Sequence, residues 1–266
     1  MGADIKTLRT RIKSVRSTQQ LTKAMGLVAS SKIRRATEGM NRTRQYADAV
    51  EQVIAMLTGV QECRKSPYMR QTDDQPRTRL IVIAGDRGLA GGYNANIFRL
   101  MREYPDAAVV PVGKRSVDRY GGEALSSETV DYTAIRQIAV EQCAAFAAGE
   151  YDRLGIVCTR YHSMMSQEAT VRWVLPLAVE PTSNNSGAIF EPDERTILDA
   201  AVPEYVAGIL LAALRESFLC EVAARRTAMD SAGKNAQEML DGLQLQYNRA
   251  RQGAITQEIT EIVAGS

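Results

Sequence analysis

The stretch of the sequence with the strongest resemblance to a chemical motif is a glycine-rich loop, GDRGLAGG, at residues 85–92. It follows a β-branched run and precedes a helical pattern, which is where phosphate-binding loops lie. Its glycines are not spaced as GxGxxG, and no Lys-Ser or Lys-Thr pair closes it. The Gly-Lys pair that follows the second β-branched run, Gly113-Lys114, has Ala108 where a Walker motif needs glycine. The spacing favours a tight strand-to-helix turn and leaves nucleotide binding as the second interpretation.

Other residue types that could do chemistry are few and scattered. His162 is the single histidine and lies beside Ser163 without a glycine elbow, so we expect a surface loop histidine and no catalytic triad. Trp173 is expected in the core. The four cysteines are too far apart for a zinc ribbon or a CxxC pair, and are predicted to be small core residues of a protein in a reducing compartment. They are Cys63, Cys143, Cys158 and Cys220. The sequence predicts no catalytic residue, metal or cofactor.

Proline divides the 266 residues into three parts. All eight prolines fall between Pro67 and Pro203, and the flanks are rich in helix-forming residues. Because proline costs a helix interior ~3 kcal/mol, two long terminal helices are predicted, over residues 1–57 and 204–263. With 45% hydrophobic residues the chain has enough apolar surface for a folded core. The longest apolar run, 206–214, is about half of what crosses a bilayer.

Apolar spacing predicts that these helices pair. In the first helix a stripe at intervals of three and four comprises Ile5, Leu8, Ile12, Val15, Gln19, Thr22, Gly26, Ala29, Ile33, Ala36 and Met40. A second stripe beside it comprises Leu21, Met25 and Val28. The last helix repeats every seven residues through Val222, Arg225, Met229, Ala232, Ala236, Met239, Leu243, Gln246, Ala250, Gly253, Gln257 and Thr260. At ~1.5 Å per residue, about 55 residues span ~80 Å, so we expect an antiparallel rod that projects from its own domain.

The middle of the chain has an α/β pattern. Three short β-branched runs, 79–85, 107–113 and 153–160, are typical of buried parallel strands, and 169–177 is predicted to be an antiparallel fourth strand. Helical spacing falls at 94–104 and 132–149, and 183–187 (SNNSG) is predicted to be a flexible loop. The predicted fold class is α/β, a Rossmann-like open sheet with a long antiparallel coiled coil. The predicted domains are 1–60, 77–190 and 193–266.

The first helix is strongly basic. Residues 1–44 contain eleven lysines and arginines against Asp4 and Glu38, whereas residues 204–266 carry six basic and eight acidic side chains. Such a helix needs a solvated face or an anionic partner, either nucleic acid or acidic protein loops. Aromatic residues are absent before Tyr46, which disfavours stacking on single strands.

Three segments together resemble the gamma subunit of F-type ATP synthases. They are LTKAM and LVASSKIRRA at 21–25 and 27–36, DRGLAGGYN at 86–94, and LQLQYNRARQGAITQEITEIV at 243–263. They occur in the family's order and span essentially the whole chain. The resemblance implies a non-catalytic central-stalk rotor that couples ion-driven rotation of a c-subunit ring to the catalytic sites of beta subunits. The implied partners are alpha and beta subunits, epsilon and the c ring, with one copy per complex on the cytoplasmic face of a bacterial membrane and no nucleic acid.

The resemblance also implies which residues contact these partners. Met25 matches the residue that abuts an acidic loop of beta, with basic neighbours, and Phe190 falls where the foot of the subunit meets the c ring. A set of polar residues in the last predicted helix matches family residues that couple the two helices to each other and to the catch region of beta. Three isoleucines near the end of the chain suit an apolar sleeve. The implied contact residues are Lys23, Met25, Arg34, Arg35, Phe190, Arg225, Arg251, Gln252, Thr256, Glu258, Ile255, Ile259 and Ile262.

Two departures from the family's pattern concern cysteine and glycine. Ala90 stands where cysteine is frequent, and no cysteine pair like that of redox-controlled chloroplast forms is present. Gly26 stands where a larger polar residue is common, which implies a weaker local contact. A basic coiled-coil protein that binds nucleic acid is the alternative function, and a dinucleotide-dependent enzyme is a third.

Overall fold

The computed structural model describes residues 2–70, 75–122, 125–129, 131–178 and 191–265, with side chains from residue 5 onward. They form two compact units. One comprises Met1–Ser31 and Arg225–Ser266, and the other Lys32–Ala224. The predicted loop at 183–187 and the predicted contact Phe190 lie outside the described residues. The predicted domain boundaries remain predictions.

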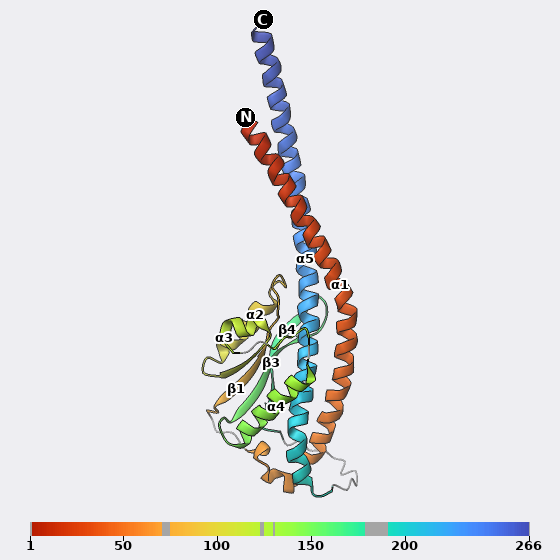
Figure 1. The fold of residues 1–266 in the computed structure, drawn as a ribbon, viewed down its shortest axis with the longest axis vertical. Helices are drawn as coiled ribbons and strands as arrows, with labels where there is room; N and C mark the ends of the chain where they lie inside the picture. The colour runs from red at the N-terminus through yellow and green to blue at the C-terminus, as the bar shows by residue number, and fades with distance from the viewer. Residues whose placement is uncertain (1, 71–74, 123–124, 130, 179–190, 266) are drawn as a thin grey trace. The chain divides into compact units, whose positions relative to one another are not determined.

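Both terminal helices are present (Figure 1). α1 runs over Gly2–Thr58 and α5 over Glu194–Ala264, as the proline-free flanks predict. α5 also contains Pro203, which lies outside the predicted helix at 204–263. The buried side chains of Leu198, Val202 and Val206 surround this proline in sequence, so tertiary burial offsets the helix-breaking cost of ~3 kcal/mol.

In the unit that contains both chain ends, α1 and α5 pair antiparallel. Gln19 donates a hydrogen bond from Nε2 to Oε1 of Gln237 at 2.8 Å. Seven residues further along α1, a Cβ on Gly26 would lie 3.6 Å from Cβ of Met229. Thr22 and Ala29, which belong to the predicted stripe of α1, are buried here. The first stripe is therefore confirmed as the pairing seam.

From Met239 onward, the predicted repeat of α5 is wrong at every second position. Met239 is 56% exposed, whereas its neighbour Leu240 is 9% exposed. Further on, Tyr247 and Ala254 are partly buried in place of the predicted Gln246 and Gly253. The intervals thus run four and three from Ala236, not three and four. Both spacings produce an apolar stripe on one face of the helix, and positions 239 and 240 are both apolar. The heptad pattern therefore could not decide which of the two is buried.

The middle of the chain folds into a four-stranded sheet with order β2-β1-β3-β4. The strands are β1 (Thr78–Ile83), β2 (Ala108–Val112), β3 (Arg153–Tyr161) and β4 (Gln167–Leu175). β1 pairs parallel with β2 and with β3, and β3 pairs antiparallel with β4, as predicted. The helices between them are α2 (Tyr93–Leu100), α3 (Lys114–Tyr120) and α4 (Tyr132–Ala147). α3 was not predicted from the sequence. Three short 3₁₀ helices cover Glu62–Lys65, Pro67–Met69 and Met101–Glu103.

Alternate residues of β1 face the two sides of the sheet and build two clusters. Ile81 and Ile83 belong to the larger cluster, which contains buried residues of α1, α4 and α5. Leu80 and Val82 face the other side, where Ile97 of α2 is fully buried. An 18-residue window of α5 is long and apolar enough to cross a membrane by composition, with a mean hydropathy of 1.7, but 61% of it is buried in the structure. This window is therefore what the core helix of a folded domain would contain.

Candidate partner-binding surface

The glycine-rich loop is a strand-to-helix turn held closed by Asp86. The carboxylate of Asp86 accepts hydrogen bonds from the backbone N–H groups of Lys114, Ser127 and Glu128 at 3.0, 3.2 and 3.1 Å. It accepts a fourth from the hydroxyl of Ser126 at 2.7 Å. Burial would raise the pKa of Asp86, but these donors stabilise the charged form and lower the pKa below its ordinary value. The carboxylate of this motif thus serves to tie the loops together.

Replacing Asp86 with alanine is expected to lower the free energy of unfolding by about 2–4 kcal/mol at pH 7, because several donors lose a charged acceptor. The folded-state pKa is depressed, so the stabilisation is present above the unfolded pKa of about 4 and is lost as pH falls through the folded value. Urea unfolding at pH 7 and pH 3 measures both effects. The exposed Asp106→Ala is the control, and a loss at Asp86 that is independent of pH would contradict this account.

His162, Trp173 and the cysteines do not assemble a reactive site. His162 is exposed, and its Nε2 lies 3.2 Å from Oε2 of Glu168 on the same hairpin. Trp173 is partly buried, with the guanidinium of Arg153 3.4 Å from its ring centroid. All four cysteines are free thiols and buried, as expected of core residues. Among the residues that the structure describes, no three His, Cys, Asp or Glu side chains gather as metal ligands.

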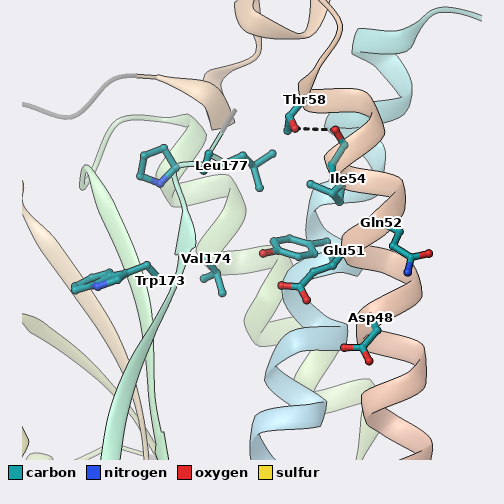
Figure 2. Close-up of a pocket in the computed structure, with 12 residues that line it drawn as sticks. Asp48, Glu51, Gln52, Ile54, Thr58, Trp173, Val174 and Leu177 are labelled. Carbon is teal, nitrogen blue, oxygen red and sulfur yellow. Dashed lines mark hydrogen bonds between the residues drawn. The ribbon is translucent and has the colours of Figure 1, made fainter. Parts of the chain in front are cut away.

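A hollow of about 570 Å³ lies between α1 and the end of β4 (Figure 2). Two of its lining residues, Asp48 and Glu51, are carboxylates on α1, and Oε1 of Glu51 accepts a hydrogen bond from Arg172 at 2.6 Å. Trp173 points away from α1 in this view. The hydroxyl of Thr58 donates to the carbonyl of Ala55. The lining residues include no histidine, lysine or cysteine.

Near the start of α1, an apolar patch faces away from α5. Leu21, Leu27 and Val28 are 59%, 61% and 58% exposed. The predicted second stripe, with Leu21 and Val28, is therefore not a helix–helix seam, because the stripe through Thr22, Gly26 and Ala29 already faces α5. Met25 is partly buried and the predicted contact Lys23 is exposed. We call Leu21, Leu27 and Val28 the α1 patch; apolar residues outside the seam register were the signal that could have revealed it.

In the unit of residues 32–224, the basic positions of α1 divide into two kinds. The ammonium group of Lys32 forms a salt bridge with Glu128, which Arg87 of the glycine loop also contacts at 3.5 Å. The predicted contacts Arg34 and Arg35 are exposed, and the described part of the chain provides neither with a hydrogen bond or an ion pair. These two cations are thus available to an acidic partner.

Most of the predicted C-terminal contact residues are exposed on the last turns of α5. Arg251, Gln252, Thr256 and Glu258 are all exposed, whereas Arg225 is partly buried. The hydroxyl of Thr256 donates to the backbone carbonyl of Gln252 at 2.9 Å, so the amide side chain of Gln252 is not engaged by it. These side chains lie on the surface of the helix, where a partner could reach them.

The tip of α5 extends beyond the start of α1 (Figure 1), and its apolar side chains are exposed. The predicted residues Ile255, Ile259 and Ile262 are 46%, 56% and 72% exposed, and Val263, which was not predicted, is 71% exposed. Leaving four large aliphatic side chains in water forgoes ~1.5–3 kcal/mol for each one that could be buried. Their exposure on one short segment indicates a partner surface.

Farther from the tip in the same unit, four cations of α1 line a hollow of about 680 Å³ next to Tyr247 of α5. The cations are Lys6, Arg9, Lys13 and Arg16. The lining contains no carboxylate, so the positive charge expected from the sequence faces the surface.

The chain matches known proteins along its length. A family model described as ATP synthase matches residues 4–266. The ATP synthase gamma chains of Exiguobacterium sp. and Geobacter metallireducens are 38% and 37% identical, each over 99% of this chain and 98% of the relative. The sodium ion specific gamma chain of Acetobacterium woodii is 35% identical over 100% of this chain and 99% of its own length.

Solved structures share the fold at lower identity. A chain of the Euglena gracilis mitochondrial ATP synthase, in a structure of OSCP, F1 and the c-ring in rotational state 3, superposes with a TM-score of 0.69. It is 21% identical, and the match covers 99% of this chain and 94% of that one. A second Euglena gracilis rotor structure gives a TM-score of 0.67 over 96% of this chain.

The combination of two long terminal helices, an open sheet and an end-to-end family match places the chain in the ATP synthase family. Within this family it belongs with the gamma chains, to which its relatives are about a third identical or more over nearly their whole length. It is therefore a non-catalytic subunit of the membrane-associated ATP synthase complex. The comparisons give no support to a nucleic-acid-binding protein.

Proposed function

We propose that this chain is the central-stalk rotor of its ATP synthase, coupling rotation of a c-subunit ring to the cycling of catalytic sites on beta subunits. The observation that carries this proposal is the full-length match to gamma chains. The physical principle is population shift: an asymmetric shaft contacts equivalent beta subunits with different faces, so its contact energy differs among their conformations. The sodium ion specific relative indicates that ion coupling is a property of such complexes.

The contacts with beta are assigned to exposed basic and apolar side chains of α1. We propose that Lys23, Met25 and the α1 patch form one contact with an acidic loop of beta, and that Arg34 and Arg35 form another. Guanidinium groups that the chain itself leaves unpaired can bind carboxylates with two parallel hydrogen bonds. Apolar neighbours exclude water from such pairs and strengthen them. In this proposal the carboxylates of beta are the anionic partner of α1, in place of the nucleic acid that its positive charge alone would also suit.

The last turns of α5 are assigned to the interior of the alpha–beta ring. Hydrogen-bonding groups for the pairing of the helices and for the catch region of beta are supplied there by Arg251, Gln252, Thr256 and Glu258, and farther back on α5 by Arg225. Ile255, Ile259 and Ile262 fit an apolar sleeve, because apolar contacts have no preferred direction and so resist rotation little. Epsilon and the c ring are proposed to bind the α/β domain, with Phe190 at the c ring and the whole complex on the cytoplasmic face of the membrane.

Mass measurement of the native complex tests this function. We expect one copy of this chain with three alpha and three beta subunits, together with epsilon and a c ring. Electrophoretic mobility of duplex DNA with the isolated chain provides the opposing measurement, repeated at low and high salt because phosphate contacts are salt-dependent. Salt-sensitive DNA binding combined with the absence of alpha and beta subunits would contradict the proposal.

Shortening the tip of α5 is expected to reduce coupling in steps. Removal of residues 262–266, then 259–266, then 255–266 should lower ATP-driven ion pumping by about two- to threefold at each step, because each step removes one isoleucine that the proposed sleeve would bury and the contacts are distributed. The substitution Ile262→Leu preserves the apolar volume and serves as the control for Ile262→Asp. Complete loss of pumping after the first truncation would show that the tip makes one specific contact instead.

A further inference from the structure

The carboxyl ends of β1 and β3 form a topological switch point in this sheet. From β1, the chain leads to β2 on one side, while β3 lies on the other. In open α/β sheets this is the crevice in which ligands bind, because no helix crosses the diverging connections. In this chain residues 216–221 of α5 occupy it: Glu216, Ser217 and Cys220 hydrogen-bond to the end of β3, and Glu221 lies against Gly85.

The α5 side chains pair with backbone groups that the sheet leaves open. The last partners in the β1–β3 ladder are Val82 and Val157. Beyond them, the N–H of Thr159 donates to Oγ of Ser217 at 3.1 Å, and the N–H of Tyr161 donates to Oε1 of Glu216 at 2.9 Å. A buried N–H group needs a hydrogen-bond acceptor. These two bonds supply one to N–H groups of β3 that lie beyond the end of the neighbouring strand β1.

Two more residues of the same turns close the crevice. The thiol of Cys220 donates to the carbonyl of Thr159 at 3.5 Å. The carboxylate of Glu221 is 3% exposed and fits against Gly85, where an added Cβ would lie 2.8 Å from its Cδ. Tyr93, 5% exposed, lies near enough that burial and the charge of Glu221 together raise the pKa of its hydroxyl. Thus the glycine at 85 makes room for a helix side chain in the position that a ligand phosphate occupies in related folds.

We propose that Glu216, Ser217 and Glu221 form a latch, here named the α5 latch, that locks α5 to the α/β domain against twisting. This inference rests on the proposed rotor function, since a shaft must pass torque to the domain it is attached to. Apolar packing of α5 on the sheet is non-directional and permits a helix to turn or slide. The latch is directional, because a turn of one residue, about 100°, carries all three side chains away from Thr159, Tyr161 and Gly85. These are positioning residues: they hold the two parts in register and contact no nucleotide.

The test uses the assembled complex in inverted membrane vesicles and compares ATP hydrolysis with ATP-driven ion pumping. The combined variant Glu216→Ala with Ser217→Ala is expected to lower the ions pumped per ATP hydrolysed at least threefold, while hydrolysis stays within twofold of the parent. Ser217→Thr and Glu216→Gln keep an acceptor oxygen and are expected to restore the ratio. Glu238→Gln, an exposed glutamate of the same helix, is the matched control.

A second variant guards against loss of folding. Gly85→Ala retains all three latch residues but places a methyl group against the carboxylate of Glu221, so it should lower the pumping ratio in the same way. An unchanged ratio in assembled complexes with either variant overturns the latch. If the combined variant does not assemble, Gly85→Ala and the single variant Ser217→Ala decide the question. Failure of the rotor function itself is distinguishable, because then the unsubstituted complex would not pump ions on ATP hydrolysis.

Discussion

Gly113→Ala is expected to unfold the α/β domain under conditions in which the parent chain is stable. Gly113 connects β2 to α3 with φ at +87°, and its N–H donates to the carbonyl of Leu125 at 2.8 Å. A Cβ on this residue would lie 1.9 Å from the carbonyl oxygen of Ala84, which is backbone directly after β1. Because Ala84 itself donates to the carbonyl of Val112 at 2.9 Å, neither strand end can retreat without breaking the pairing.

The expected loss is at least about 4 kcal/mol, a large part of the ~5–15 kcal/mol that stabilises an ordinary domain. Urea unfolding followed by circular dichroism measures it. Gly121→Ala is a matched control, since Gly121 also has a positive φ of +81° but has no atom within 4 Å of the added Cβ. It should pay only the backbone strain of about 1–3 kcal/mol. Equal losses for the two variants would show that strain, and not the contact with Ala84, sets the requirement for glycine.

Gln252→Ala is expected to reduce ATP turnover of the assembled complex by about 10- to 100-fold while leaving the chain as stable as before. The side chain is exposed in the structure, so its removal should change the free energy of unfolding by no more than ~0.5 kcal/mol. In the complex, the proposed hydrogen bond to the catch region of beta is worth ~1.5–3 kcal/mol if its partner is charged. Arg251→Ala is expected to act in the same direction.

Steady-state ATPase measurements on purified complexes, together with a check of subunit composition, distinguish turnover from assembly. Gln246→Ala is the control, because it removes an exposed glutamine less than two turns away on the same helix. If Gln252→Ala and Gln246→Ala have the same turnover, the assignment of Gln252 to the catch region is wrong. If Gln252→Ala blocks assembly, its role is in binding and not in the cycle.

Much of this fold could be predicted from spacing alone. The stripe from Ile5 to Met40 repeats at intervals of three and four over eleven positions, so its mean period identifies both the helix and its buried face. The strands followed from short β-branched runs, and the antiparallel β4 agrees with the short hairpin that separates it from β3. The resemblance at residues 21–36, 86–94 and 243–263 together identified the family, which the full-length match then confirmed.

The features that escaped prediction depend on neighbours distant in sequence. Met239 and Leu240 are equally apolar, and only the position of α1 selects Leu240 for the seam. By its sequence alone, the GDRGLAGG loop suits either a phosphate site or a turn. The turn is decided only when folding brings Ser126, Ser127 and Glu128, some forty residues along the chain, to the carboxylate of Asp86. Local propensity and periodicity act over a few residues and can therefore be read along the chain. Which of two compatible faces is buried, and which helix fills the end of the sheet, is set by non-local packing and hydrogen bonding, and these exist only after the chain has folded.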